Sequence, residues 1–395
     1  MPPRSVLRDI SDEMNHEQVI GNMTKKESVS RKIRRERGKV LERPTIPTDY
    51  VPFFNMPDRY TKTSDGGDFL RAVQWTDGPD SQALLLFLSD HGKSLLKTYR
   101  SWNMDGTFQT CPAQFSQLYF IFAITDTGKT IPAAYSLLPN KKCYGLLFEE
   151  LKKIIEETSH LEKVMVDFEK GVHRQIEESF PNASVSGCLF HYKQAVRRQL
   201  GAKGCMALYN ADRNFQTLVS MLYSLPFVPS HEVVHVFETV VQPFFEDCAD
   251  DWTEEGYDEE TGDFFKYFER TYIGLSTRTG RRNPLFKIET WNHHCEVLKD
   301  DFVVTNNGIE SFNSSRTPSI PRNASIWSVL ECLNKEDSMS KVTYMEYLRG
   351  TNQAHNKSRD KNNRAKTEEL KSICEKWMEF DSKDYLEAIR NFYKH

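Results

Sequence analysis

The fold is decided by residues 101–138, which read SWNMDGTFQTCPAQFSQLYFIFAITDTGKTIPAAYSLL. Within them, residues 117–125 and 130–138 are short apolar runs rich in β-prone residues, and the DTGK between them is a turn sequence of the hairpin kind. Residues 101–107 form a further strand-like segment ahead of this pair. The stretch therefore predicts three strands, of which the last two form a hairpin.

Helices and strands alternate after the hairpin. Apolar residues recur at helical spacing in residues 144–158, and a short strand is predicted at 163–166. A helix over 169–180, a strand over 183–188 and a helix over 189–200 complete the order β-β-β-α-β-α-β-α. This order predicts an α/β fold, in which a mixed five-stranded sheet carries helices on its faces.

Composition limits the function before any motif is considered. The chain has 395 residues, of which 38% are hydrophobic, so it can bury a core and is not wholly disordered. No apolar run approaches the ~20 residues of a membrane-spanning helix, so we expect no membrane partner. The formal net charge is -4, and any nucleic acid must therefore bind to local basic patches. The eight cysteines are scattered, which favours free thiols in a reducing compartment.

The first 44 residues are polar and contain a basic cluster, Lys25–Lys26 and Arg31–Lys39. One interpretation is a nuclear-localisation or nucleic-acid-binding patch. The other is an exposed helix with internal ion pairs, to which Glu27 and Glu36 would contribute. The residue pattern leaves both open.

Three acidic residues suggest a metal-binding site. Asp105 lies within a predicted strand, where a buried carboxylate is costly without a partner or a metal. Asp167 follows strand 163–166, at the edge where open α/β sheets bind ligands. If the two strands are neighbours, a divalent cation would offset the repulsion between their carboxylates. Glu310 could complete a two-metal site for a phosphodiester. Taken singly, each acid also fits a turn or a helix terminus.

Cys188 and His191 form a C-x-x-H pair where a predicted strand meets a helix. A closed zinc site needs four ligands, and no second pair lies nearby, so the sequence does not predict a structural zinc site. The alternative is a buried thiol beside a histidine that caps the helix.

Residues His231 to His235 match the zinc-protease pattern H-E-x-x-H. Pro229 and Ser230 place this match in the first turn of a helix, with Ser230 as its cap, and the sequence signals no third ligand. We therefore interpret the match as a chance pattern. Trp252 and Trp291 could stack on nucleic-acid bases, although a position in the core is the alternative for both.

Taken together, residues from about 100 to 330 resemble the catalytic domain of Mutator-like element (MULE) transposases, which belong to the RNase H-like DDE superfamily. Four blocks carry the resemblance, in family order: WNMDGTF with QLYFIFAI and KTIPAAYSLL, then VMVDFEKGV, then FPNASVSGCLFHYKQAV, then TNNGIESFNSSR. The resemblance implies an RNase H-like mixed five-stranded sheet that is interrupted by an all-helical insertion domain.

The resemblance also implies an activity and its residues. Asp105, Asp167 and Glu310 would be the catalytic acids and would hold two Mg²⁺ or Mn²⁺ ions, and Cys188 and His191 would be the family's C-x-x-H motif. Such enzymes cut one strand at a transposon end and then use its 3′-hydroxyl to attack target DNA. The expected partner is double-stranded DNA, both transposon ends and target, and the expected location is the nucleus. A homodimer is expected because two ends are held together.

Phosphates would be held by basic side chains. The candidates are Arg197, Arg198, Arg281 and Arg282, and each could equally lie on a solvated face. No cysteine precedes Cys111, so the zinc-binding recognition module of many relatives is not expected upstream. This departure keeps an alternative open, namely a domesticated, catalytically silent DNA-binding or regulatory nuclear protein.

The predicted division of the chain follows from these patterns. It consists of a basic arm (1–44), a linker and accessory region (45–98), the first part of the catalytic core (99–204), an all-helical insertion domain (205–302), the last catalytic helix of the core (303–330) and a charged helical region (331–395).

Overall fold

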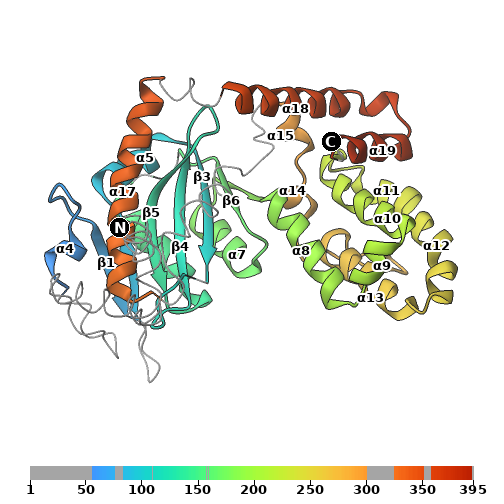
Figure 1. Cartoon of the computed structure of the whole chain (residues 1–395), viewed down its shortest axis with the longest axis horizontal. Coiled ribbons are helices and arrows are strands. Elements are labelled where there is room, and N and C mark those ends of the chain that lie inside the picture. Colours follow the sequence, from blue (N-terminus) through green and yellow to red (C-terminus); the bar gives the residue numbers. More distant parts are fainter. Residues whose placement is uncertain are drawn as a thin grey trace, which may run out of the picture.

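The computed structural model describes residues 56–75, 83–108, 110–156, 158, 160–299, 324–350 and 357–393. They form two lobes, one built around a β-sheet and one made of helices (Figure 1). The basic arm 1–44 and Glu310 lie outside the described residues. Within the described ranges, no helix combines the length and the apolar character that crossing a membrane requires.

The sheet lobe contains a seven-stranded mixed sheet in the order β1-β2-β5-β4-β3-β6-β7. Neighbours from β1 to β3 in this order pair antiparallel, whereas β6 pairs parallel with both β3 and β7. The strands are β1 (Leu70–Trp75), β2 (Ala83–Phe87), β3 (Ser101–Thr107), β4 (Gln117–Ile124), β5 (Thr130–Leu138), β6 (Lys163–Val166) and β7 (Ser184–Gly187).

The α/β class, the hairpin and the two later strands are confirmed, but the predicted count of five strands is wrong. Strands β1 and β2 extend the sheet beyond β5. Strand β2 lies between two other strands and buries Leu84 to Phe87 completely, which explains its unbroken apolar run. Periodicity cannot distinguish such a short apolar run from part of a buried helix, so the sequence does not predict β2 as a strand of the sheet.

Helices cover both faces of the sheet. One face packs against α5 (Asp90–Thr98), α6 (Tyr144–Ile155) and α7 (Lys170–Ser179), and the other against α4 (Asp58–Thr61) and α17 (Ile326–Leu348). Alternate residues of each strand divide between the two cores: Trp102 and Met104 face the first set, and Phe120 and Phe122 face α17. This alternation puts Asp105 on the α17 side, because it pairs with Phe120.

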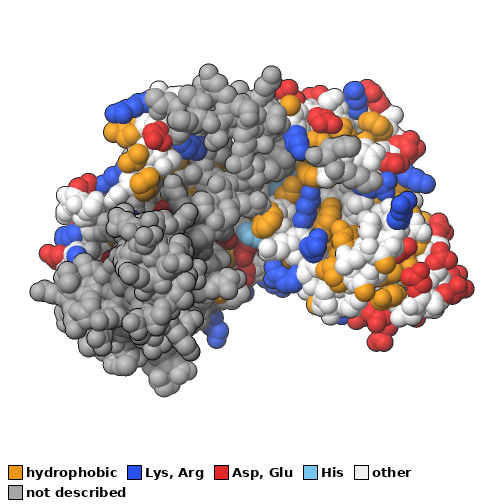
Figure 2. Space-filling view, in the orientation of Figure 1, with side chains coloured by type: hydrophobic (Ala, Val, Ile, Leu, Met, Phe, Trp, Pro, Cys, Tyr) orange, Lys and Arg blue, Asp and Glu red, His pale blue; other side chains and the backbone are white. Residues whose placement is uncertain are grey.

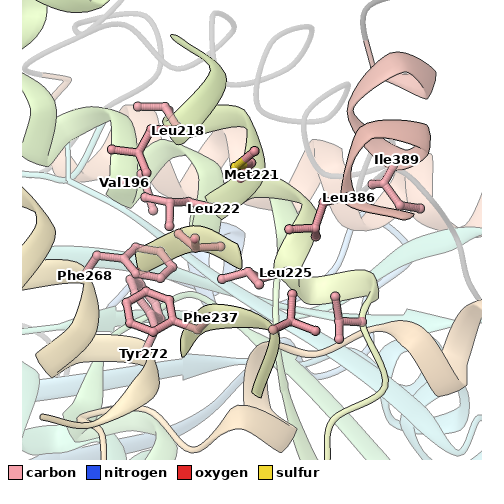
Figure 3. Packing of buried hydrophobic residues seen from close by; sticks show 14 of the residues in the cluster. Val196, Leu218, Met221, Leu222, Leu225, Phe237, Phe268, Tyr272, Leu386 and Ile389 are labelled. Atoms are coloured by element: carbon pink, nitrogen blue, oxygen red, sulfur yellow. The ribbon is translucent and has the colours of Figure 1, made fainter. Parts of the chain in front are cut away.

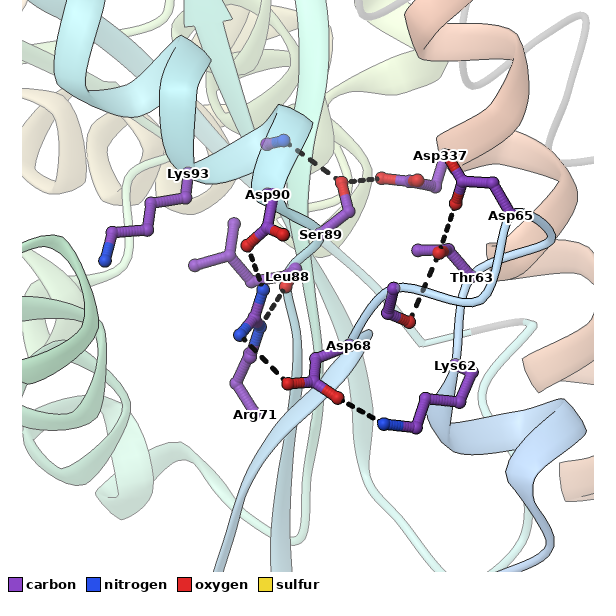
Figure 4. Close-up of polar contacts among 12 residues, drawn as sticks. Lys62, Thr63, Asp65, Asp68, Arg71, Leu88, Ser89, Asp90, Lys93 and Asp337 are labelled. Atoms are coloured by element: carbon purple, nitrogen blue, oxygen red, sulfur yellow. Dashed lines mark hydrogen bonds and ion pairs between the residues drawn. The ribbon is translucent and has the colours of Figure 1, made fainter.

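Buried polar contacts fix α17 on the sheet lobe. Ser89 Oγ donates a hydrogen bond of 2.6 Å to Asp337 Oδ1, as Figure 4 shows, and Ser340 Oγ donates one of 2.6 Å to the carbonyl of Pro132. Burial raises the pKa of Asp337, and the hydrogen bond from Ser89 opposes this rise. Since polar groups in a core must be paired, these contacts specify the position of α17 as well as stabilising it.

The second lobe is helical apart from a short hairpin of β8 (Ser276–Thr277) and β9 (Gly280–Arg281). Its elements are α8 (Leu189–Ala202), α9 (Met206–Ala211), α10 (Arg213–Ser224), η3 (Leu225–Phe227), α11 (Val233–Val236), η4 (Phe237–Val241), α12 (Gln242–Glu254), α13 (Asp258–Phe268), η5 (Glu269–Ile273), α14 (Ile288–Trp291) and α15 (His294–Leu298). Figure 3 shows how Leu222, Phe237 and Tyr272 meet in the core of this lobe. Trp252 and Trp291 also lie in this core.

The C-terminal helices join the two lobes. Helix α17 lies on the sheet, whereas α18 (Lys357–Glu375) and α19 (Ser382–Phe392) pack on the helical lobe (Figure 1). Tyr385 Oη donates a hydrogen bond of 2.6 Å to the carbonyl of Phe227, and Leu370 of α18 is fully buried in the helical core. One continuous part of the chain therefore holds both lobes.

Candidate active site

Asp105 and Asp167 lie side by side at the carboxyl edge of the sheet. The parallel register of β3 and β6 pairs Asn103 with Met165, so two residues further along each chain Asp105 comes beside Asp167. Residues two apart on a strand point to the same face, and on this face Asn103 Nδ2 donates to Met165 Sδ at 3.6 Å. Asp105 and Asp167 therefore occupy the same face at the same edge of the sheet. Their strands lie ~4.8 Å apart, as neighbouring strands do.

Asp105 is the more buried of the two acids, with only 7% of the residue exposed, whereas Asp167 is half-buried. The backbone amide of Gly106 donates a hydrogen bond of 3.0 Å to Asp105 Oδ1. A Cβ at position 106 would come within 1.7 Å of Gln117 Nε2, so any other residue after the acid would displace the Gln117 side chain. Two negative charges held this close repel each other, and a cation between them would relieve the repulsion.

His191 brings a third polar side chain to the acids. It lies in the first turn of α8, and its Nε2 is 4.0 Å from Asp105 Oδ1. Burial lowers the pKa of His191, but hydrogen bonding and attraction to the Cys188 sulfur and the charges of Asp105 and Asp167 outweigh burial and raise the pKa to about 9. The raised pKa favours the positively charged imidazole, which would screen the two carboxylates. Within the described ranges, its buried Nδ1 has no hydrogen-bond partner.

Cys188 lies at the strand-to-helix junction, as the C-x-x-H spacing predicts. It is 2% exposed and forms the N-terminal cap position of α8. The preceding Gly187 allows the ring of Phe168 to lie against the end of β7, since a Cβ there would meet that ring at 2.4 Å. The pair thus sits beside the acids and not in a separate four-ligand cluster.

The backbone that carries Asp167 is held from the helical lobe. Phe168 packs against Tyr192 and Phe286, with ring centroids 6.0 and 5.2 Å away. His173 Nε2 donates a hydrogen bond of 2.6 Å to the carbonyl of Asp167, and burial lowers the pKa of His173, which favours the neutral ring. No sequence motif marks Phe168 or His173 as a support of the site, although each lies within six positions of Asp167.

Further polar groups line the same edge. Tyr144 Oη lies 2.8 Å from Gln117 Oε1 and 3.3 Å from Glu169 Oε2. The nearby Tyr119 hydroxyl is buried and has no hydrogen-bond partner within the described residues. Burial raises the pKa of Tyr119, and the negative charges of Asp167, Asp105 and Glu169 add to the rise. Glu169 is therefore a further carboxylate close to the acid pair, and it accepts a hydrogen bond from the Tyr144 hydroxyl.

The acid pair has the chemistry of a cation ligand. Carboxylate oxygens are the ligands that Mg²⁺ prefers, and this ion keeps several waters. Across the described ranges, no three His, Cys, Asp or Glu side chains converge closely enough to hold a metal ion without other ligands. Glu310, the predicted third acid, falls outside those ranges. Asp105 and Asp167 supply two carboxylates of the kind that such an ion takes as ligands.

Basic side chains extend from the acids along α8. Arg197 and Arg198 are both exposed, and Arg198 Nη2 lies 3.3 Å from Gln194 Oε1 one turn away. Figure 2 shows Lys and Arg side chains on the face of the helical lobe that adjoins the sheet lobe, and acidic side chains at its far end. Positive charge is thus concentrated on the side of the helical lobe nearest the acid pair.

The other predicted basic pair is divided by the fold. Arg281 has ion pairs of 2.7 Å with both Glu238 and Glu269, and only 14% of its side chain is exposed. Its guanidinium also donates to the carbonyl of Gly274. Arg281 therefore holds the hairpin of β8 and β9 in place and is unsuited to contact phosphate. Arg282 is exposed.

The H-E-x-x-H match spans a turn and a short helix. His231 lies in the turn with 77% of its side chain exposed, and α11 begins only at Val233. The helix cap is therefore Glu232 and not Ser230 as predicted. Only His235 belongs to the helix, so the pattern does not place both imidazoles on one helical face.

The fold and the site define an α/β domain with an acidic pair at the carboxyl edge of two neighbouring parallel strands. Residues 101–195 match the family model of the MULE transposase domain. The match begins at the first residue of β3 and includes Asp105, Asp167, Cys188 and His191. The resemblance to MULE transposases is confirmed over this range. A search of curated proteins finds no relative of this chain.

Proposed function

We propose that this chain cleaves DNA and transfers DNA strands, using Asp105, Asp167 and Glu310 as ligands for two Mg²⁺ or Mn²⁺ ions. The observation that carries the proposal is the parallel pairing of β3 with β6 inside the matched domain, because its register, continued by two residues, brings Asp105 beside Asp167. When bound, the metal ions would activate the attacking oxygen and stabilise the leaving oxygen of the phosphodiester. This chemistry needs acids held at fixed positions, which the sheet provides.

The surrounding residues have separable tasks in this proposal. The Gly106 amide and the charged imidazole of His191 orient Asp105, whereas His173 and Phe168 hold the backbone at Asp167. His191 would also attract the phosphate, because its positive charge lies beside the acid pair. Accurate placement of reacting groups accounts for a large part of catalysis in phosphoryl transfer.

The test is nicking of a supercoiled plasmid by the full chain in Mg²⁺ or Mn²⁺. We expect Asp105→Asn, Asp167→Asn and Glu310→Gln each to lower the nicking rate by at least ~100-fold, because each removes a metal-ligand charge. Asp126→Asn is the matched control: this aspartate is exposed in the β4–β5 turn, at the opposite end of the same strands. It should nick at the wild-type rate.

A second readout separates metal binding from catalysis. Mg²⁺ should raise the melting temperature of the wild type and of Asp126→Asn, and should raise it much less in Asp105→Asn or Asp167→Asn, because a ligand that binds the folded state stabilises it. Nicking that is unchanged in both active-site variants would refute the catalytic proposal. DNA binding without metal-dependent nicking by the wild type would instead favour the catalytically silent, regulatory alternative.

We further propose that double-stranded DNA lies along α8 and contacts Arg197, Arg198 and, from the loop after β9, Arg282. These residues are exposed, and the first two share a helix with His191. Replacing Arg197 and Arg198 with glutamate should weaken binding to any duplex and reduce its salt dependence, since each phosphate contact releases counterions. An unchanged salt slope would exclude α8 as the DNA surface. The nuclear location and the homodimer stay predictions.

A further inference from the structure

Two phenylalanine side chains are exposed at the carboxyl edge of the sheet. Phe108 is 52% exposed and Phe190 is 41% exposed, which makes them the two most exposed phenylalanines of the described residues. Trp252 and Trp291 are buried, at 1% and 0% exposure. The two tryptophans considered from the sequence as stacking residues therefore belong to the core.

Both phenylalanines lie beside the candidate active site. The ring of Phe190 is 5.5 Å from that of His191, whose Nε2 is 4.0 Å from Asp105. Phe108 follows the last residue of β3 and is three positions beyond Asp105. The two exposed rings thus belong to elements that also carry site residues: Phe190 shares the first turn of α8 with His191, and Phe108 directly follows the strand that carries Asp105.

The polar surroundings of these rings indicate what they bind. The exposed residues of α8 continue from Phe190 to Arg197 and Arg198, so one surface of this helix joins an aromatic ring to positive charge. Single-stranded nucleic acid is bound by this combination, in which basic groups follow the phosphates and aromatic rings stack on the bases. An apolar protein partner would instead fit a wider hydrophobic patch without a carboxylate pair at its margin.

We propose that Phe108 and Phe190 form a stacking site for an unpaired nucleobase of the strand whose phosphodiester meets Asp105 and Asp167. This inference rests on the proposed function and adds the conformation of its substrate. The base would be unstacked from its neighbours, so that the adjoining phosphodiester can enter the edge of the sheet. Stacking depends on the face of the base and not on its hydrogen-bonding edge, so the site would tolerate all four bases.

The test uses the full chain, Ca²⁺ in place of Mg²⁺, and a 20-nucleotide single strand with one central 2-aminopurine. Binding of the wild type should change the fluorescence of the probe as the base stacks on an aromatic ring. Phe190→Ala and Phe108→Ala should each lose most of this change and raise Kd roughly 5- to 100-fold. Phe190→Trp should retain both signals, because tryptophan presents a larger stacking surface.

Phe380→Ala is the matched control, because Phe380 is 37% exposed and lies between α18 and α19, outside the sheet lobe. It should bind and report like the wild type. Wild-type fluorescence and Kd in the double variant Phe108→Ala/Phe190→Ala would overturn the stacking site, as would failure of the wild type to bind the strand. Neither result affects the nicking test of Asp105 and Asp167, so the two proposals fail separately.

Discussion

Glu296 connects the helical lobe to the sheet, and its replacement by glutamine should lower stability in a pH-dependent manner. The residue belongs to α15, and its carboxylate pairs with Lys163 at the start of β6. It also lies 2.9 Å from His293 Nδ1 and accepts a hydrogen bond of 3.3 Å from Ser186 Oγ of β7. Glutamine keeps the shape of the side chain and removes its charge.

The magnitude follows from the pKa of this carboxyl. Burial raises the pKa of Glu296, but hydrogen bonding and attraction to His293 and Lys163 outweigh burial and lower it from 4.5 to about 2. One pKa unit corresponds to about 1.4 kcal/mol, so the charged form contributes about 3 kcal/mol to the free energy of unfolding at pH 7. Because the folded pKa is the lower one, this contribution is complete above pH ~4.5 and is lost as the pH falls through ~2.

Urea unfolding of the wild type and of Glu296→Gln at pH 7, 5 and 3 measures this difference. It should be about 3 kcal/mol at pH 7, nearly as large at pH 5, and less than half as large at pH 3. Glu178→Gln is the control, since its ion pair with Arg174 is exposed and should contribute less than about 0.5 kcal/mol. A difference that stays constant from pH 7 to pH 3, or one no larger than that of the control, would refute this reasoning.

Three further substitutions test individual residues of the two lobes. Gly106→Ala should cost about 1–3 kcal/mol, because the new Cβ displaces Gln117; an unchanged melting temperature would contradict the close approach. Burial lowers the pKa of Lys193 to about 7, so the wild type should gain stability relative to Lys193→Met as the pH rises from 7 to ~10, and parallel melting curves would argue against this. Phe168→Ala should cost about 2–4 kcal/mol and slow plasmid nicking, measured by thermal melting and by the plasmid assay; full activity would show that Asp167 does not depend on this ring.

The sequence predicted the central elements closely, because their apolar patterns are local. Strand β6 has its predicted bounds, 163–166, and α8 begins at its predicted first residue, Leu189. The pairing of β3 with β6 was only a condition in the sequence analysis, and the parallel register confirms it. Strands β1 and β2 were not predicted, because a short apolar run such as β2 does not indicate whether it is a strand or which strand it pairs with.

Contacts between distant residues account for what the sequence did not reveal at the site. Arg281 is paired with Glu238, 43 positions away, so one member of a basic pair that resembles a DNA contact is held within the helical lobe. The exposure of Phe190 could not be predicted from the sequence either, because a phenylalanine in a helix normally faces a core. Glu310 lies outside the described residues, and its role as the third acid stays a prediction.

Phe168 and Asp167 are consecutive residues, and this adjacency makes the helical lobe a determinant of the chemistry. The ring is enclosed by Tyr192, Tyr272 and Phe286, so their packing sets the direction in which the peptide leaves β6. A sheet lobe produced without its helical companion would therefore keep both carboxyl groups in its sequence and lose the alignment between them. Engineering of a minimal version of this domain should retain the whole aromatic cage around residue 168.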